Sequence, residues 1–161
     1  MADPNGWGNE FKFQKVPGDW GTEINSGMMM SITGDLKDAG GNFGATAGET
    51  VYFVTLDLGN NTLDGKAITN MNLVGSFNGW NAADDAQQMT WDAENYCYVI
   101  TGAGVDADGW KFTTNNSWDV NLGGDTLDNL VANGANISAV GTTIKLYPTR
   151  KDSDNIYCTV E

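Results

Sequence analysis

Two tryptophans in this sequence stand where a side chain can meet a ligand, because each follows a predicted turn. Trp80 follows Asn78-Gly79, a pair that signals a tight turn with positive φ. Trp118 follows the polar stretch Asn115-Asn116-Ser117. An indole beside a turn offers a flat apolar plane with polar groups around it.

Such a plane is complementary to a sugar ring, which has apolar C–H faces and hydroxyl edges. Asparagine can both donate and accept hydrogen bonds, and lysine can only donate them. The sequence therefore predicts a carbohydrate-binding surface, and its expected members are Trp80, Lys111, Asn116, Trp118 and Asn121.

A structural role for the aromatic residues stays open beside this interpretation, since large aromatic side chains are often highly buried. Alternation along a strand places Trp110 and Phe112 on one face and Lys111 on the other. We expect Trp110 in the core. Trp80 and Trp118 can serve the fold whichever ligand is bound.

Catalytic chemistry is disfavoured, because the chain contains no histidine. Histidine is the usual general base and the commonest metal ligand. Paired carboxylates can hydrolyse glycosides, but the acids here lie in Gly- and Asn-rich turns, where aspartate commonly bonds its own backbone. The candidates are Asp84, Asp85, Asp106, Asp108, Asp119 and Asp125. We expect no catalytic residue.

Two acidic turns have calcium-like composition, 106–109 and 152–155. Neither ends in the glutamate that completes a calcium loop, so both are interpreted as solvated turns. No metal and no cofactor is expected.

The net charge restricts the partners. Lys plus Arg number 8 against 21 Asp plus Glu, which gives a formal charge of −13. Nucleic acids and anionic membrane surfaces are repelled by such a surface. A neutral ligand is not.

The composition predicts an all-β fold. The 161 residues include 21 glycines and only three prolines, and short apolar runs alternate with turn residues. About seven short strands at close spacing between residues 67 and 161 suit an immunoglobulin-like β-sandwich. Residues 59–66 are expected to be a polar connector.

An internal repeat divides the chain. The stretch 109–125 has an earlier counterpart at 10–24, and the likeness continues from 133–147 to 41–54. Each copy is too long to be one turn of a solenoid, so we expect tandem sandwich modules. Residues 68–108 have no counterpart before the first hairpin. The sequence thus predicts an incomplete module at 1–66 and a complete one at 67–161.

The first copy departs from the pattern of the second. Lys12 and Trp20 match Lys111 and Trp118, but no Phe-Asn-Gly-Trp stretch faces them. Half a sandwich also exposes strand edges. We expect residues 1–60 to pack on the complete module, to pair between chains or to depend on upstream sequence.

Compartment and redox state stay open at this point. No apolar run is long enough to span a membrane, and no leader is recognisable. Cys97 and Cys158 lie in separate predicted strands, where either a disulfide or two buried thiols is reasonable.

The second copy resembles a known family. The motifs are 73–80 (Leu-Val-Gly-Ser-Phe-Asn-Gly-Trp), 89–95 (Met-Thr-Trp-Asp-Ala-Glu-Asn), 110–112 with 115–118, and 122–125 (Leu-Gly-Gly-Asp). In this order they resemble the module of SusE/SusF-type outer-membrane starch-binding lipoproteins. The resemblance covers residues 68–161 well, and 8–58 as the latter half of a preceding module.

The resemblance implies tandem β-sandwich modules on the cell surface, anchored in the outer membrane by an upstream lipidated cysteine, which bind α-glucan without cleaving it. Other glycan-uptake proteins are implied as partners. In similar starch- and glycogen-binding modules two Trp residues and a Lys meet the sugar, which points to Trp80, Lys111 and Trp118. The alternative is a structural spacer or protein-interaction module of a surface complex with no sugar site.

Overall fold

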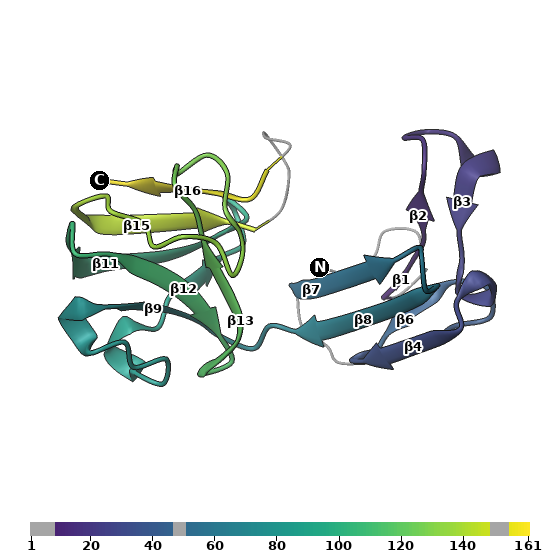
Figure 1. Cartoon of the computed structure of the whole chain (residues 1–161), viewed down its shortest axis with the longest axis horizontal. Coiled ribbons are helices and arrows are strands. Elements are labelled where there is room, and N and C mark those ends of the chain that lie inside the picture. The colour runs from purple at the N-terminus through teal and green to yellow at the C-terminus, as the bar shows by residue number, and fades with distance from the viewer. Residues whose placement is uncertain (1–8, 47–50, 149–154) are drawn as a thin grey trace. The chain divides into compact units, whose positions relative to one another are not determined.

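The fold is all-β, as the sequence predicts. The structure is a computed structural model that describes residues 9–46, 51–148 and 155–161. Regular structure in these residues consists of strands and four short 3-10 turns (Figure 1). None of these turns is long and apolar enough to cross a membrane.

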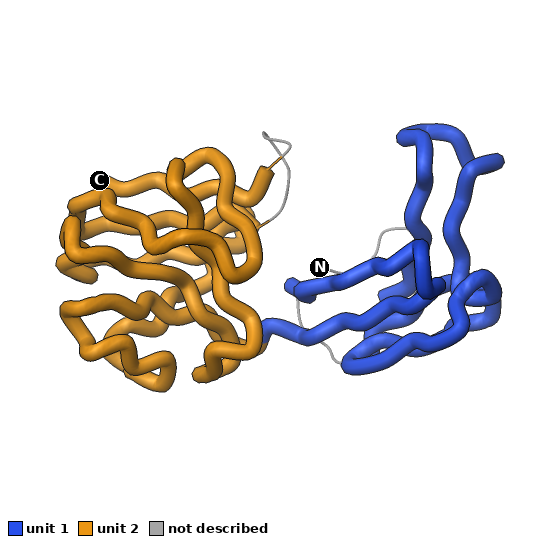
Figure 2. The backbone as a smooth tube through the Cα atoms, viewed as in Figure 1, with its two compact units in different colours: residues 1–68 blue, residues 69–161 orange. Residues whose placement is uncertain are grey.

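The chain divides into two compact units, residues 1–68 and 69–161 (Figure 2). This division lies two residues after the boundary expected from the sequence. Each unit has its own strands and its own buried residues.

The first unit contains three small sheets. Their orders are β1-β6-β5, β4-β8-β7 and the hairpin β2-β3. The core is a cluster of Ile24, Leu36, Phe43 and Leu63. The strands and turns are β1 (Glu10–Phe11), β2 (Phe13–Gln14), η1 (Trp20–Thr22), β3 (Glu23–Ile24), η2 (Ser26–Met28), β4 (Ser31–Gly34), β5 (Leu36–Asp38), β6 (Phe43–Ala45), β7 (Tyr52–Asp57) and β8 (Thr62–Ala67).

Strand β8 corrects an expectation, because residues 59–66 were predicted to be a polar connector. Leu63, Gly65 and Ala67 are buried and alternate with the polar residues Asp64 and Lys66. This is the pattern of a strand with one face in the core. The charged residues on the other face made this segment resemble a connector in the sequence.

The second unit is a sandwich of two four-stranded sheets. One has the order β14-β13-β12-β9 and the other β10-β11-β15-β16 (Figure 1). The elements are β9 (Met71–Gly75), η3 (Ser76–Asn78), η4 (Asp85–Gln87), β10 (Thr90–Asp92), β11 (Cys97–Val105), β12 (Trp110–Thr114), β13 (Ser117–Gly123), β14 (Val131–Ala132), β15 (Gly141–Tyr147) and β16 (Tyr157–Val160).

The core of the second unit is formed by strand residues that alternate inward and outward. Trp110 and Phe112 are fully buried, with ring centroids 5.3 Å apart in an edge-to-face arrangement. The indole Nε1 of Trp110 donates to the carbonyl oxygen of Ala139 at 2.8 Å. The prediction that Trp110 belongs to the core is confirmed.

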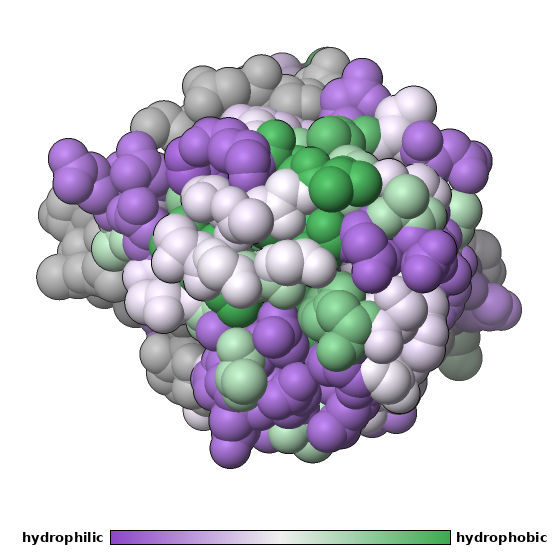
Figure 3. All heavy atoms as spheres, turned by 90° about the vertical axis from the view of Figure 1, so that its left-hand side faces the viewer, coloured by the Kyte–Doolittle hydropathy of each residue, from purple (hydrophilic) through white to green (hydrophobic). Residues whose placement is uncertain are grey.

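On the side of the molecule shown in Figure 3, apolar residues reach the surface in a small area surrounded by polar ones.

The internal repeat is also a repeat of strand register. Phe13 pairs with Ile24 and Phe11 with Phe43 in the first unit. In the second unit Phe112 pairs with Leu122, and Trp110 forms a bridge with Ile137. Both units end in an antiparallel hairpin, β7–β8 and β15–β16.

The two units differ in what flanks this terminal hairpin. Strand β15 is paired on its other edge with β11. In the described part of the first unit, β7 is an edge strand that pairs with β8 alone. In its described residues, the first unit also differs by the parallel pairing of β4 with β8, whereas the described strands of the second unit pair antiparallel.

Both cysteines are buried free thiols. Tyr98, Leu146 and Cys158 are aligned across three strands, and Cys97, one residue away from Tyr98, lies on the opposite face. The two sulfurs thus face different sides of one sheet. Burial raises the pKa of the Cys158 thiol to about 12, which keeps it protonated and unreactive.

Candidate functional site

Trp80 is positioned by the turn that ends η3. The N–H of Trp80 donates to the carbonyl of Gly75 at 2.9 Å, and the N–H of Gly79 donates to that of Ser76 at 3.2 Å. These two bonds, with Gly79 in the left-handed region, form a Schellman motif. The predicted Asn-Gly turn is confirmed, and Trp80 itself also has a positive φ of 62°. A bulky residue in that conformation stores strain, which is typical of functional sites.

Asn78 fixes this turn from inside. Its Oδ1 accepts a hydrogen bond from the Gly75 N–H at 3.0 Å. Its Nδ2 lies within hydrogen-bond distance of the carbonyls of Leu73 and Asn81 and of Asp84 Oδ2. Asn78 is therefore a structural residue of the Phe-Asn-Gly-Trp stretch, and Trp80 is the one that it presents.

Trp118 is positioned by the hairpin between β12 and β13. Asn115 and Asn116 both have positive φ, as a two-residue type I′ turn requires. The register then shifts between Thr113 and Thr114, so Trp118 lies in an irregular stretch of β13. The hairpin tip is fixed to the start of β9, because the Asn116 N–H donates to Asn70 Oδ1 at 3.1 Å.

The two tryptophans meet. Their ring centroids lie 6.1 Å apart, and the ring planes are inclined by 34°. The Trp118 side chain is 42% exposed, and Trp80 is half-buried. Two rings that are distant in sequence thus form one indole pair that solvent can reach.

Asn121 is buried and bonded to the backbone of Trp118, so it is not an exposed part of the indole pair. It is only 7% exposed. Its Nδ2 donates to the carbonyl of Trp118 at 3.3 Å and to Oδ1 of Asn133 at 2.8 Å. The N–H of Asn133 in turn donates to the carbonyl of Asn121 at 3.0 Å. Sequence reasoning missed Asn133, although the Asn133-Gly134 pair marks a turn next to the strand.

Lys111 and Asn116 are not joined to the indole pair. In the described residues no hydrogen bond, ion pair or ring contact links either side chain to Trp80 or Trp118. Lys111 lies between Val74 and Gly123 in the sheet, and a β-carbon on Gly123 would lie 2.8 Å from its Cε. Asn116 is exposed at the hairpin tip. The structure thus brings Trp80 and Trp118 together, with Asn121 bonded to the Trp118 backbone.

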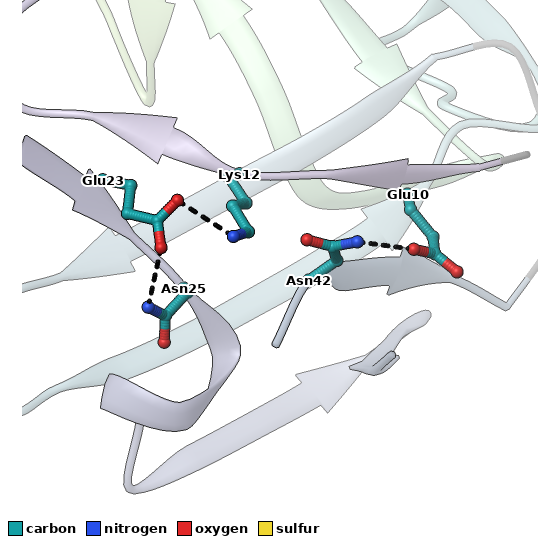
Figure 4. Close-up of polar contacts among 5 residues, drawn as sticks. All are labelled: Glu10, Lys12, Glu23, Asn25 and Asn42. Carbon is teal, nitrogen blue, oxygen red and sulfur yellow. Dashed lines mark hydrogen bonds and ion pairs between the residues drawn. The ribbon is translucent and has the colours of Figure 1, made fainter. Parts of the chain in front are cut away.

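The equivalent lysine of the first unit is engaged. Lys12 Nζ lies 2.9 Å from Glu23 Oε2, and Glu23 Oε1 accepts a hydrogen bond from Asn25 (Figure 4). The shared register makes Glu23 the counterpart of Asn121. Trp20, the counterpart of Trp118, is 67% exposed and has no ring partner among the described residues.

Two of the acidic candidates, Asp84 and Asp106, accept hydrogen bonds in turns. Asp84 accepts a hydrogen bond from the Ala86 N–H, and Asp106 accepts from the Asp108 N–H and from Ser76 Oγ. Across the described residues, no group of three His, Cys, Asp or Glu side chains is placed to hold a metal ion. The acidic positions 152–154 lie outside the described residues.

Comparisons with known proteins place the chain in no family. No protein-family model matches it, and no curated protein matches it either.

Proposed function

We propose that the second unit binds a neutral polysaccharide without cleaving it, and that an α-glucan such as starch is its ligand. The observation that carries the proposal is the indole pair of Trp80 and Trp118. A pair of accessible indoles offers apolar area for the faces of two neighbouring sugar rings.

The angle between the rings favours a curved chain. Two planes inclined by 34° fit sugar units that turn relative to each other, as they do along an α-glucan. A flat ribbon-like glycan is better matched by coplanar rings. The Nδ2 group of Asn133, whose Oδ1 is engaged by Asn121, and the Lys111 ammonium supply donors in the same unit for hydroxyl groups.

The charge of the chain agrees with a neutral ligand. Because the chain has a formal net charge of −13, it would repel an anionic polymer but not a neutral glycan. Hydroxyls exchange bonds to water for bonds to protein with little net gain. We expect a single site with a dissociation constant between about 1 mM and 1 µM, or about −4 to −8 kcal/mol.

The proposed setting is the outer surface of the cell, within a glycan-uptake system. The support for this setting is the sequence resemblance to SusE/SusF-type modules. The absence of histidine and the engagement of Asp84 and Asp106 in turns support a binding role without catalysis.

The test is affinity electrophoresis in gels that contain amylopectin, glycogen or no glycan. We expect the native chain to be retarded, and Trp80→Ala and Trp118→Ala each to lose affinity about tenfold or more, which is about 1.4 kcal/mol. Trp20→Ala is the matched control, because that indole is more exposed but stands alone, and it should migrate as the native chain does.

Retardation that survives both substitutions would refute the indole pair as the site. No retardation by any α-glucan would refute the ligand and favour the spacer or interaction module. Release of reducing sugar during incubation would refute the non-catalytic role.

A further inference from the structure

A row of three buried polar side chains crosses the sheet of the second unit. Asn72 on β9 pairs with Thr113 on β12, and Thr113 pairs with Asn121 on β13. Alternation places all three on the face opposite to Phe112. Asn72 and Thr113 are fully buried and Asn121 is nearly so.

The amide nitrogens of the row are satisfied, and this fixes how the amides are oriented. Asn72 Nδ2 donates to the carbonyl of Asp84 at 3.1 Å. Asn121 Nδ2 donates to the carbonyl of Trp118 and to Asn133 Oδ1. Rotating either amide by 180° would place its oxygen against another oxygen, so each Oδ1 must point elsewhere.

Three oxygen atoms of this row have no protein partner among the described residues. They are Asn72 Oδ1, Thr113 Oγ1 and Asn121 Oδ1, and all three are buried. Leaving a buried polar atom unpaired is costly, and native proteins rarely do so. Three such atoms on adjacent strands therefore call for one shared partner.

The partner must supply two donors and one acceptor. Each Asn oxygen accepts a hydrogen bond, whereas the Thr113 hydroxyl needs an acceptor for its proton. Threonine is also shorter than its two asparagine neighbours, which flank it on the adjacent strands. Water has two donors and accepts through its oxygen, and buried waters typically make about three hydrogen bonds. A cation would leave the threonine proton without an acceptor, and a sugar hydroxyl cannot reach Asn72 and Thr113, which are fully buried.

We propose that one ordered water molecule is bound among Asn72, Thr113 and Asn121, where it accepts from Thr113 Oγ1 and donates to both Oδ1 atoms. This water connects the two segments that hold the indole pair. Asn72 holds Asp84, whose carboxylate contacts Asn78 in the Trp80 turn, and Asn121 holds the backbone of Trp118. Thr113 is thus a positioning residue for the pair, independently of which ligand the pair binds.

The test compares the native chain with Thr113→Val, which keeps the shape but removes the hydroxyl, and with Thr113→Ser, which keeps the hydroxyl. High-resolution crystal structures of the native chain and of Thr113→Ser should show a water within hydrogen-bond distance of all three oxygens. In Thr113→Val the water should be lost or displaced. The far-ultraviolet circular dichroism couplet of the indole pair, identified as the signal that Trp118→Phe abolishes, should weaken in Thr113→Val and persist in Thr113→Ser.

Two results would overturn the proposal. One is electron density in the native crystal that shows direct protein contacts and no water at the row. The other is an indole couplet that is equally strong in Thr113→Val and in the native chain. If Thr113→Val does not fold, the density in the native and Thr113→Ser crystals still decides the question.

Discussion

The hairpins of the two units have the same strand register, but different residues surround them. In the second unit, Lys111 and Trp118 belong to a hairpin whose outer face is covered by the turn at 133–135 and whose tryptophan meets Trp80. In the first unit Lys12 is paired with Glu23, and the exposed Trp20 contacts no other ring within the described residues.

The difference teaches that a repeated motif carries the scaffold of a site and not the site itself. The aromatic-Lys-Phe strand and the later tryptophan recur in both units. The partner ring comes from the Ser76–Trp80 turn, and no counterpart of this turn lies in the described part of the first unit, residues 9–46 and 51–68. Without it, we expect the first hairpin to lack glycan affinity.

The largest difference in stability loss between the two units is expected when the equivalent core phenylalanine is replaced by alanine in each. Phe112 is fully buried against Trp110, whereas its counterpart Phe13 is half-buried in a cluster with Phe11 and Phe43. We expect Phe112→Ala to destabilise its unit by about 3–5 kcal/mol. Phe13→Ala should cost less, because part of that ring already contacts water.

Urea unfolding, with hydrogen exchange to assign each transition to a unit, measures both losses. Each substitution should lower protection in its own unit only. Equal losses for the two variants would contradict the view that the first unit has the looser core.

A smaller difference is expected where a side chain is added next to the lysine. A β-carbon on Gly123 would lie 2.2 Å from the carbonyl oxygen of Ala135 and 2.8 Å from Lys111 Cε. The equivalent position in the first unit carries a side chain, Asn25. We expect Gly123→Ala to cost about 1–3 kcal/mol through overpacking, and Asn25→Ala to cost less.

Thermal unfolding of both variants beside the native chain tests this expectation. Gly123→Ala should also lower glycan affinity. The added methyl group would displace both neighbours of Gly123, the Lys111 side chain and the turn at 133–135. If Gly123→Ala is as stable as Asn25→Ala, the turn at 133–135 moves to accommodate the methyl group without loss of stability.

Much of the architecture was predictable, because it depends on local patterns. Alternating apolar residues gave the all-β class, and the turn residues at 78–79 and 115–116 gave the turns that present both tryptophans. The burial of Trp110 followed from its sharing a face with Phe112. Strand β8 was missed, because Asp64 and Lys66 on its outer face resemble a connector.

The detail of the site was less accessible, since it depends on strand pairing. Asn121 has the residue type of a ligand contact, yet pairing with Thr113 places it in the buried polar row on the sheet face opposite to Phe112. Asn133 becomes a neighbour only because β14 pairs with β13. The left-handed conformation of Trp80 has no signal of its own, because tryptophan rarely adopts it.

The smallest effect is expected for the Lys12–Glu23 ion pair, which distinguishes Lys12 from its counterpart Lys111. The Lys12 ammonium and the Asn25 amide, both bonded to the Glu23 carboxylate, lower the pKa of Glu23 below its ordinary value. A carboxyl group with a lowered pKa stabilises the folded state above its unfolded pKa, and this stabilisation is lost as the pH falls through the folded pKa. We therefore expect the hairpin at 10–25 to lose hydrogen-exchange protection on acidification, after correction for intrinsic exchange rates. The loss should be small, because the pair is partly exposed and such pairs contribute little.

Glu23→Gln removes the titrating group, so the hairpin should be less protected at neutral pH and should change less on acidification. Glu161→Gln is the matched control, since it removes the partner of Lys145 in the second unit and should leave the first hairpin unchanged. The same acid response in Glu23→Gln and in the native chain would assign the response to other carboxylates. The Lys12–Glu23 pair would then be a contact without energetic weight, and the isolation of Trp20 alone would distinguish the first hairpin from the second.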